Sequence, residues 1–420
     1  MCVNKEPLGK QAWLLLAVDG LFVLSGALSG TFLNIYLWRS RSDYAMIGWF
    51  TAAQQAALGI SFWIGGRWVK GRGKMNALRV GIALSGLFYL LVLRLGPRSV
   101  DYIWPLGALL GAALGLFWLS FNVVYFEITG PGNRDRFNGW TGLLGSLTGI
   151  VGPWTSGALI SAMKGERGYR VVFLASLSIY GAAAVLSLAL RRRKTAGSYR
   201  WLEPVRRLRV SGQWRCMAGA LFFQGLREGV FSFLVGLLVY LATREENRLG
   251  QFTLMTSAIA LVSYGAAGRW LTPRRRLPGM LAGAVLLTAV TLPLLAGTRY
   301  STLLLFGAGT ALFLPLYMLP MVSSSFDLMG DSEDSVGKRV ELIVLRELSL
   351  MAGRLTGTLL FVSLLPLGPK LRLFTLLLLG LGAAPFGSWF LLRRSAPALS
   401  AAGKPKPRSL RGYLRNGRER

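Results

Sequence analysis

The apolar residues of this chain come in blocks of twenty or more, and these blocks constrain the fold more than any other feature. The hydrocarbon core of a bilayer is about 30 Å thick and takes roughly 20 helical residues to cross. Stretches such as 12–38, 102–126 and 372–392 reach that length. Only 16% of the 420 residues are charged, whereas a soluble domain carries about a quarter. The sequence therefore predicts an all-α polytopic membrane protein.

About twelve such blocks follow one another along the chain. We place these spans at residues 12–38, 45–66, 76–95, 102–127, 138–163, 170–190, 214–241, 249–271, 278–297, 301–326, 339–364 and 371–392. A basic, polar connector after the sixth block divides the chain near its middle. We therefore expect a six-helix half at 1–195, a linker at 196–213, a second six-helix half at 214–394 and a basic tail at 395–420.

An internal repeat supports this division. The gap after the second block reads GRWVKGRGKM from Gly66, and the gap after the eighth reads GRWLTPRRRL from Gly268, 202 residues later. The same offset aligns residues 47–51 with 249–253 without a gap. Two matches in one register, each at the same place in the topology, predict two pseudo-symmetric bundles.

The chain has a formal net charge of +30, and its basic residues are spread unevenly over the gaps between the spans. Lys and Arg gather in alternate gaps and at both ends, for example in the runs 191–194 and 274–276. This is the pattern of the positive-inside rule, so we expect both termini in the cytoplasm and an even number of spans in the cell membrane. A nucleic-acid-binding protein would instead gather its basic residues on one soluble face.

Several kinds of chemistry are excluded by what the sequence lacks. It has no His and only two cysteines, Cys2 and Cys216, without the spacing of a metal site or a disulfide framework. The phosphate-binding pattern GxxxxGK[ST] is absent, which argues against ATP hydrolysis. We therefore expect no cofactor, no metal and no enzymatic activity.

The whole pattern resembles the major facilitator superfamily, over about residues 10–394. The segment from Gly65 to Lys74 is similar to the family's motif after the second span, but the motif's Asp is missing. In the family that Asp helps to latch the cytoplasmic gate, so the latch here needs another carboxylate. The resemblance implies gate positions for the basic residues of this loop: Arg67, Lys70, Arg72 and Lys74. Residues 32–39 and 226–231 further resemble uncharacterised permeases of Gram-positive bacteria.

Small residues form a stripe along the fifth span. Gly145, Gly149, Pro153 and Gly157 recur every four residues, and Gly152 adjoins them. Such a stripe lets another helix approach closely, and Pro153 bends the span. It also resembles the Gly-Pro motif of family members that export by antiport. Plain helix packing explains the stripe equally well.

Charged residues inside the spans are costly and mark functional positions. By family geometry, spans one, four, seven and ten line the central cavity, which implies a substrate path near Asp19, Arg227 and Glu228. Asn34 is a further candidate, and so is Trp118, whose ring could stack on a planar or lipophilic substrate. We favour Glu228 as a proton-coupling carboxylate, because a desolvated carboxylate can take up and release a proton as the cavity opens and closes. The alternative is a static ion pair that fixes the packing of the spans.

Four charges lie on the eleventh span: Glu341, Arg346, Glu347 and Arg354. We expect them to face Glu127, Arg134 and the basic loop after span two, and to form a gate between the halves. Direct substrate contact and a packing network are the alternatives. Nearby acidic residues, Asp327, Asp331, Glu333 and Asp334, favour a solvated loop over a Mg²⁺ or Ca²⁺ site.

The function that the sequence favours is secondary active transport of a small molecule by alternating access. We expect a monomer coupled to protons, with a lean to efflux of amphipathic compounds because the spans are rich in aromatic residues. The alternatives are a metabolite uptake permease and a non-transporting sensor or partner subunit. A membrane enzyme acting on lipids is disfavoured, because no His or acidic cluster lies inside the spans.

Overall fold

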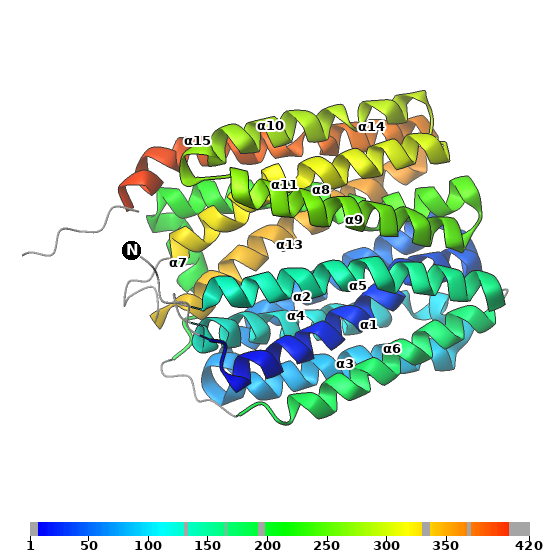
Figure 1. Cartoon of the computed structure of the whole chain (residues 1–420), viewed down its shortest axis with the longest axis horizontal. Helices are drawn as coiled ribbons and strands as arrows, with labels where there is room; N and C mark the ends of the chain where they lie inside the picture. The colour runs from blue at the N-terminus through cyan, green and yellow to red at the C-terminus, as the bar shows by residue number, and fades with distance from the viewer. Residues whose placement is uncertain are drawn as a thin grey trace, which may run out of the picture.

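The structure is a computed structural model that describes residues 7–129, 133–163, 166–191, 198–329, 337–367 and 371–402. Long helices run side by side along the longest axis of the molecule (Figure 1). The first helix begins and the last one ends at the same end of this bundle. We call it the terminal end, and the opposite one the far end.

Six long helices form the first half of the chain. They are α1 (Lys10–Arg41), α2 (Tyr44–Trp68), α3 (Lys74–Leu95), α4 (Ile103–Ile128), α5 (Arg134–Met163) and α6 (Glu166–Ser187). A π-helical turn, Val69–Gly73, joins α2 to α3, and a 3₁₀ segment, Gly96–Tyr102, joins α3 to α4.

The second half repeats this arrangement. Its helices are α8 (Gly212–Thr243), α9 (Glu246–Trp270), α10 (Arg276–Ala289), α11 (Tyr300–Met329), α13 (Arg339–Leu364), α14 (Leu371–Gly382) and α15 (Ala384–Ala402). A 3₁₀ turn, Leu292–Ala296, extends α10, and α14 with α15 makes up the twelfth span. The basic, polar linker contains the short helix α7 (Glu203–Val210), which lies at the terminal end (Figure 1).

Ten stretches of the described chain are long and apolar enough to cross a membrane. One of them, Lys74–Ile128, contains both α3 and α4, and α2 is a further long helix outside the ten. The adjacent pair Gln54 and Gln55 lowers the mean hydropathy of α2. The prediction of an all-helical, polytopic membrane protein is confirmed.

The sequence repeat reappears in the helix boundaries. Helix α8 begins and ends 202 residues after α1, and α9 begins and ends 202 residues after α2. Both turns use a left-handed residue with a side chain, Ser42 at φ 50° and Arg244 at φ 58°. In each turn this residue ends the first helix and its N–H bonds back to the carbonyl four residues earlier, which reverses the chain within two residues.

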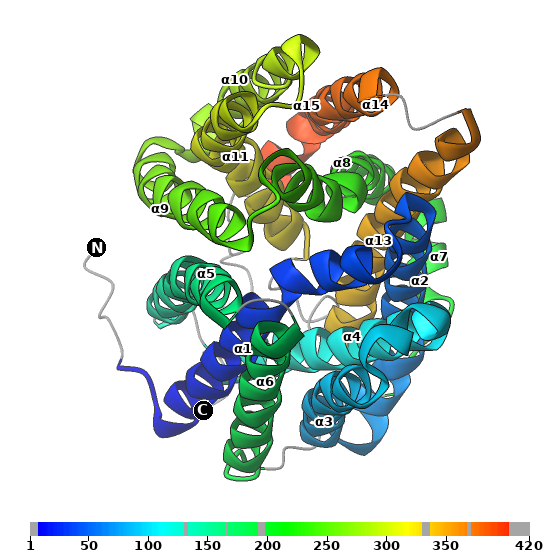
Figure 2. The ribbon, with the colours of Figure 1, turned by 90° about the vertical axis from the view of Figure 1, so that its right-hand side faces the viewer.

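The two halves meet along two main helix pairs. Helix α2 packs against α13, and α5 packs against α9, while α1 contacts α8 more lightly. Figure 2, which looks along the bundle, shows α2 beside α13 on one side and α5 beside α9 on the other. We call these pairs the α2/α13 seam and the α5/α9 seam. The space that they enclose holds the candidate site.

Candidate transport cavity

A cavity of about 770 Å³ lies between the two halves. Helices α1, α2, α3, α4 and α6 contribute residues from the first half, and α8, α9, α11 and α13 contribute from the second. A smaller cavity of about 240 Å³ shares Gly30, Asn34, Phe252 and Thr256 with it and includes residues nearer the far end, such as Leu249. Residues of both halves therefore surround one central volume, as a site used in alternating access requires.

The cavity wall combines aromatic rings with a few polar groups. The rings belong to Phe50, Tyr89, Tyr180, Phe231, Phe233, Phe252 and Phe306. The uncharged polar groups belong to Asn34, Thr51, Gln54, Gln55, Ser232, Thr256, Ser257 and Thr310. Such a wall suits a molecule with an apolar body and a small number of polar groups. Asn34, one of the candidate substrate residues, lies in the cavity lining.

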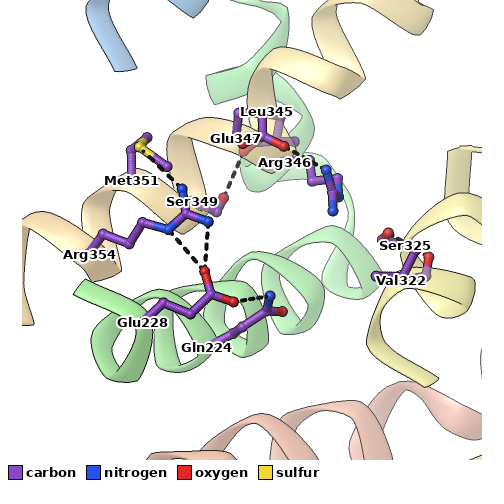
Figure 3. Close-up of polar contacts among 10 residues, drawn as sticks. All are labelled: Gln224, Glu228, Val322, Ser325, Leu345, Arg346, Glu347, Ser349, Met351 and Arg354. Atoms are coloured by element: carbon purple, nitrogen blue, oxygen red, sulfur yellow. Dashed lines mark hydrogen bonds and ion pairs between the residues drawn. The ribbon is translucent and has the colours of Figure 1, made fainter. Parts of the chain in front are cut away.

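Glu228 forms an ion pair with Arg354 across α8 and α13 (Figure 3). Its Oε2 accepts hydrogen bonds from Nη2 of Arg354 at 2.6 Å and from Nε at 3.0 Å. Its Oε1 accepts a third from Nε2 of Gln224 at 2.8 Å. Both charged side chains line the cavity and are about a quarter exposed. The pair is therefore well bonded yet reachable from the cavity.

Glycines explain why α8 and α13 come close enough for this pair. Gly225 and Gly229 on α8 pack against the backbone of α13 at Leu350 and Arg354. Gly353 and Gly357 on α13, also four residues apart, pack against the backbone of α8 at Phe222 and Leu226. A Cβ on Gly225 would lie 2.2 Å from the carbonyl oxygen of Leu350, so no larger residue fits without displacing backbone. The spacing of these glycines, a small residue at every fourth position, is visible in the sequence of both spans. It is a signal from which the contact between the two spans could have been predicted.

Arg227, the neighbour of Glu228, has a different environment. Its side chain is 5% exposed and lines the cavity, and its guanidinium lies 4.4 Å from the ring centre of Phe231. Nε and Nη2 are buried without a hydrogen-bond acceptor among the described residues. Adjacent residues on a helix point about 100° apart, which is why Glu228 reaches Arg354 and Arg227 does not share that carboxylate.

Two of the candidate substrate residues, Asp19 and Trp118, lie outside the cavity lining. Asp19 is 1% exposed, and its Oδ1 has no hydrogen-bond partner among the described residues. Trp118 packs edge-to-face against Phe22, Phe117 and Phe121. The geometry therefore assigns Trp118 a packing role in this conformation rather than contact with a bound molecule.

One predicted gate pair crosses between the halves at the terminal end. Nζ of Lys70 lies 2.6 Å from Oε1 of Glu341 on α13, and it also donates to the carbonyl of Gly337 at 2.8 Å. The same Oε1 accepts the backbone N–H of Arg200 in the linker at 3.1 Å. Both side chains are buried. Glu341 is thus the carboxylate that faces the basic loop after α2, where the family motif has its Asp.

Linker residues cover this ion pair. Burial, followed by the negative charge of Glu341, raises the pKa of Tyr199, so its phenol stays neutral. Arg67 stacks over the ring of Trp201 at 5.8 Å. The side chains of Arg72 and Arg134 lie outside the described part of the structure. Of the predicted acidic cluster, Asp327 forms an ion pair with Arg276, and Asp331, Glu333 and Asp334 lie outside the described residues.

The remaining gate predictions are corrected by the structure. Glu127 forms an ion pair with Lys74 of its own half, not with Arg346. Arg346 pairs with its neighbour Glu347 at 2.6 Å and lies over the ring of Phe326. Because Arg354 turns to Glu228, the charges of α13 divide among separate partners instead of forming one stripe toward Glu127.

A second cross-half cluster, at the far end, was missed by the sequence analysis. Nη1 of Arg39 on α1 lies 2.6 Å from Oε1 of Glu246 on α9, and the hydroxyl of Tyr169 on α6 donates to the same oxygen at 3.1 Å. The backbone N–H of Asn247 donates to Ser161 nearby. Glu246 follows a turn that is repeated in both halves, but nothing in the sequence indicated which helix it faces.

The small-residue stripe of α5 forms part of the α5/α9 seam. A Cβ on Gly157 would lie 2.8 Å from the carbonyl oxygen of Glu246, and Ser257 of α9 donates to the carbonyl of Gly149 at 3.1 Å. Gly152 packs against Ala27 of α1. No described atom lies within 4 Å of a Cβ built on Gly145. The close glycine contacts of this seam therefore lie at Gly149 and Gly157, toward the far end, and not at Gly145.

Comparison with known proteins agrees with this architecture. The chain is 36% identical to the uncharacterised protein YqgE of Bacillus subtilis over 365 residues, which cover 87% of this chain and 85% of that one. It is 32% identical to the uncharacterised transporter YebQ of Escherichia coli over 118 residues, 27% of this chain and 25% of that one. A crystal structure of a bacterial homologue of the iron transporter ferroportin, in an outward-facing state, shares the fold, with a TM-score of 0.65. It is 16% identical, and the match covers 94% of this chain and 100% of that one.

A family match covers the larger part of the chain. Residues 15–332 match the Major Facilitator Superfamily, a span that runs from α1 across the linker into the second half. Family, helix arrangement and central cavity agree with one another, and none of them indicates an enzyme. The chain belongs to the major facilitator superfamily and is a membrane-embedded secondary transporter.

Proposed function

We propose that the chain exports amphipathic small molecules in exchange for protons, by alternating access to the central cavity. The observation that carries this proposal is the Glu228–Arg354 pair in the cavity wall. Adding a proton to Glu228 removes the negative charge that holds Arg354. Arg354 belongs to α13, which packs along α2 of the other half. A change of protonation in the cavity thus acts on a helix that joins the two halves.

The terminal end is the cytoplasmic end in this proposal. The basic residues of the α2–α3 turn, of α7 and of the α9–α10 connection are consistent with that orientation, since Lys and Arg favour the cytoplasmic side. The close contacts of α5 with α9 lie at Gly149 and Gly157, and Gly145, nearer this end, has none. We infer that the two helices separate at this end when an exporter loads its substrate from the cytoplasm.

The nature of the cavity wall supports an amphipathic substrate. Seven aromatic rings line the cavity, and only three of its lining residues are charged, namely Arg227, Glu228 and Arg354. We infer that the transporter acts as a monomer, because one chain supplies both halves of the cavity. We also infer that it belongs to the branch of YqgE and of an uncharacterised Geobacillus stearothermophilus protein, which is 37% identical over 46% of this chain and 91% of its own.

The direct experiment uses purified protein in liposomes with an acidic interior. Cationic ethidium, anionic carboxyfluorescein and neutral Nile red are offered outside, so that the panel does not presuppose the charge of the substrate. We expect the wild type to accumulate at least one probe, and Glu228→Gln to lose this accumulation while it still exchanges preloaded probe. Unchanged accumulation by Glu228→Gln contradicts proton coupling. No movement of any probe by the wild type contradicts amphipathic export.

A further inference from the structure

The guanidinium of Arg227 is the charged group of the cavity lining that the proton-coupling proposal leaves unused. Arg227 lies in the cavity wall and is only 5% exposed. Among the described residues no acceptor reaches its Nε or Nη2, and it forms no ion pair. A buried cation without a partner is strongly unfavourable unless something else supplies the negative charge.

The other arginine of the cavity, Arg354, has the carboxylate partner that Arg227 lacks. Arg354 directs Nε and Nη2 to one carboxylate oxygen of Glu228. Gln224 occupies the other oxygen of that carboxylate. Glu228 thus accepts three hydrogen bonds from its own partners, whereas the same two donors of Arg227, Nε and Nη2, have no acceptor among the described residues. The cavity lining thus contains two guanidinium groups, those of Arg227 and Arg354, but a single carboxylate, that of Glu228.

The side chain of Arg227 is held in place by its own helix. Phe231, one turn later on α8, lies under the guanidinium at 4.4 Å. Contact of this kind covers one face of the guanidinium, so its N–H groups can donate only to an acceptor that lies in the plane of the group. The three charged residues in the lining leave the cavity with one net positive charge. That charge matches an anion with a single negative charge.

We propose that Arg227 binds the carboxylate of the transported molecule, which is therefore an amphipathic organic acid. Its apolar body lies against the aromatic rings of the cavity, and its carboxylate accepts hydrogen bonds from the Arg227 guanidinium. A planar carboxylate can accept two parallel hydrogen bonds from a guanidinium. Its single negative charge would neutralise the net positive charge of the cavity lining. This inference rests on the proposed transport function and names the substrate class of the same cavity.

The test measures binding, so that it does not depend on transport. Detergent-purified protein is titrated calorimetrically with three matched pairs: benzoate and benzamide, 2-naphthoate and 2-naphthamide, 4-phenylbutyrate and its amide. Each pair shares its apolar body and differs in charge. We expect at least one carboxylate to bind about tenfold or more tightly than its amide, the ratio that one charge-assisted hydrogen bond supplies. If no acid in the panel binds better than its amide, the proposal is overturned.

Variants then assign the preference to Arg227. Arg227→Gln should bind acid and amide about equally, with the amide's affinity unchanged. Arg227→Lys, which keeps the charge but loses the planar fork, should retain part of the preference, and it decides the question if the Gln variant does not fold. Arg170→Gln, on an exposed residue of α6, is the matched control and should behave as the wild type. A preference that persists at full strength in both Arg227 variants overturns the assignment.

The two proposals fail in distinguishable ways. Glu228→Gln removes a negative charge from the cavity and should bind the preferred acid at least as tightly as the wild type does. Selective binding without proton-driven transport would leave the carboxylate site standing and remove proton-coupled export. Proton-driven accumulation of a probe, with no preference for acids over amides, would do the reverse.

Discussion

The two seams that join the halves are equivalent by pseudo-symmetry but differ in how far they are closed. The α2/α13 seam is packed from end to end: Gly48 meets Val362 near the far end, Gly59 meets Met351 in the middle, and Lys70 meets Glu341 at the terminal end. The α5/α9 seam is packed at Gly157 and Gly149 and is open at Gly145.

This difference indicates how the halves can move. A seam with close side-chain packing and a buried ion pair resists separation, because parting it would expose two charges and a packed apolar surface. Near Gly145 the α5/α9 seam has no such close contact, so its helices can move there without breaking one. We infer that the α2/α13 seam acts as the hinge and the α5/α9 seam as the entrance on the terminal side.

The largest effect should come from the hinge ion pair. Lys70→Met leaves Glu341 charged and buried, and such a loss typically costs about 3–5 kcal/mol in the free energy of unfolding. Chemical denaturation in detergent, followed by tryptophan fluorescence, measures it. The double variant Lys70→Met/Glu341→Met should recover most of the loss. A single variant as stable as the wild type would mean that this seam is not held by the pair.

A matched pair of glycine substitutions compares two positions of the α5/α9 stripe. Gly157→Ala places a Cβ 2.8 Å from the carbonyl oxygen of Glu246, and overpacking of this kind costs about 1–3 kcal/mol. Gly145→Ala meets open space and should be neutral or stabilising by up to about 1 kcal/mol, as Ala favours helix more than Gly. Thermal unfolding of both variants in detergent measures the difference between them. Equal effects at the two positions would contradict the claim that α5 is packed closely at Gly157 and loosely at Gly145.

The smallest effect is expected at the far-end cluster. Arg39 is 41% exposed, so its ion pair with Glu246 contributes about 1 kcal/mol or less. Arg39→Gln should nevertheless open the far end more often. A membrane-impermeant maleimide would report this on Thr256→Cys, placed in a background without the native Cys2 and Cys216, as labelling a few-fold faster. The same rate with and without Arg39→Gln would show that this cluster does not restrain the far end.

The positions of the helices could be predicted from the sequence much more closely than the partners of their charged side chains. Span eleven was predicted at 339–364, the bounds of α13, because twenty or more apolar residues between polar gaps are a signal that no tertiary contact can override. The fifth span begins four residues earlier than predicted, at Arg134, where polar residues continue the helix beyond the apolar block.

The partners of the charges could not be predicted in the same way, because they depend on how each helix is rotated about its axis. Arg346 and Arg354 were expected to share a stripe toward Glu127, but they bind Glu347 and Glu228. The contact between α8 and α13 was readable from Gly225, Gly229, Gly353 and Gly357, whose spacing appears on both helices. Recognising that pattern would have linked Glu228 to the right span.

The claim that one seam is the hinge and the other the entrance can be measured directly with spin labels. One pair, Gly142→Cys with Gly268→Cys, reports the terminal ends of α5 and α9. The other, Gly71→Cys with Gly337→Cys, reports those of α2 and α13, and all four positions have open space for a side chain. Pulsed electron paramagnetic resonance should show that Glu228→Gln shifts or broadens the α5–α9 distance by several ångströms, while the α2–α13 distance stays narrow and unchanged. An α2–α13 distance that changes as much as the α5–α9 distance would contradict the account.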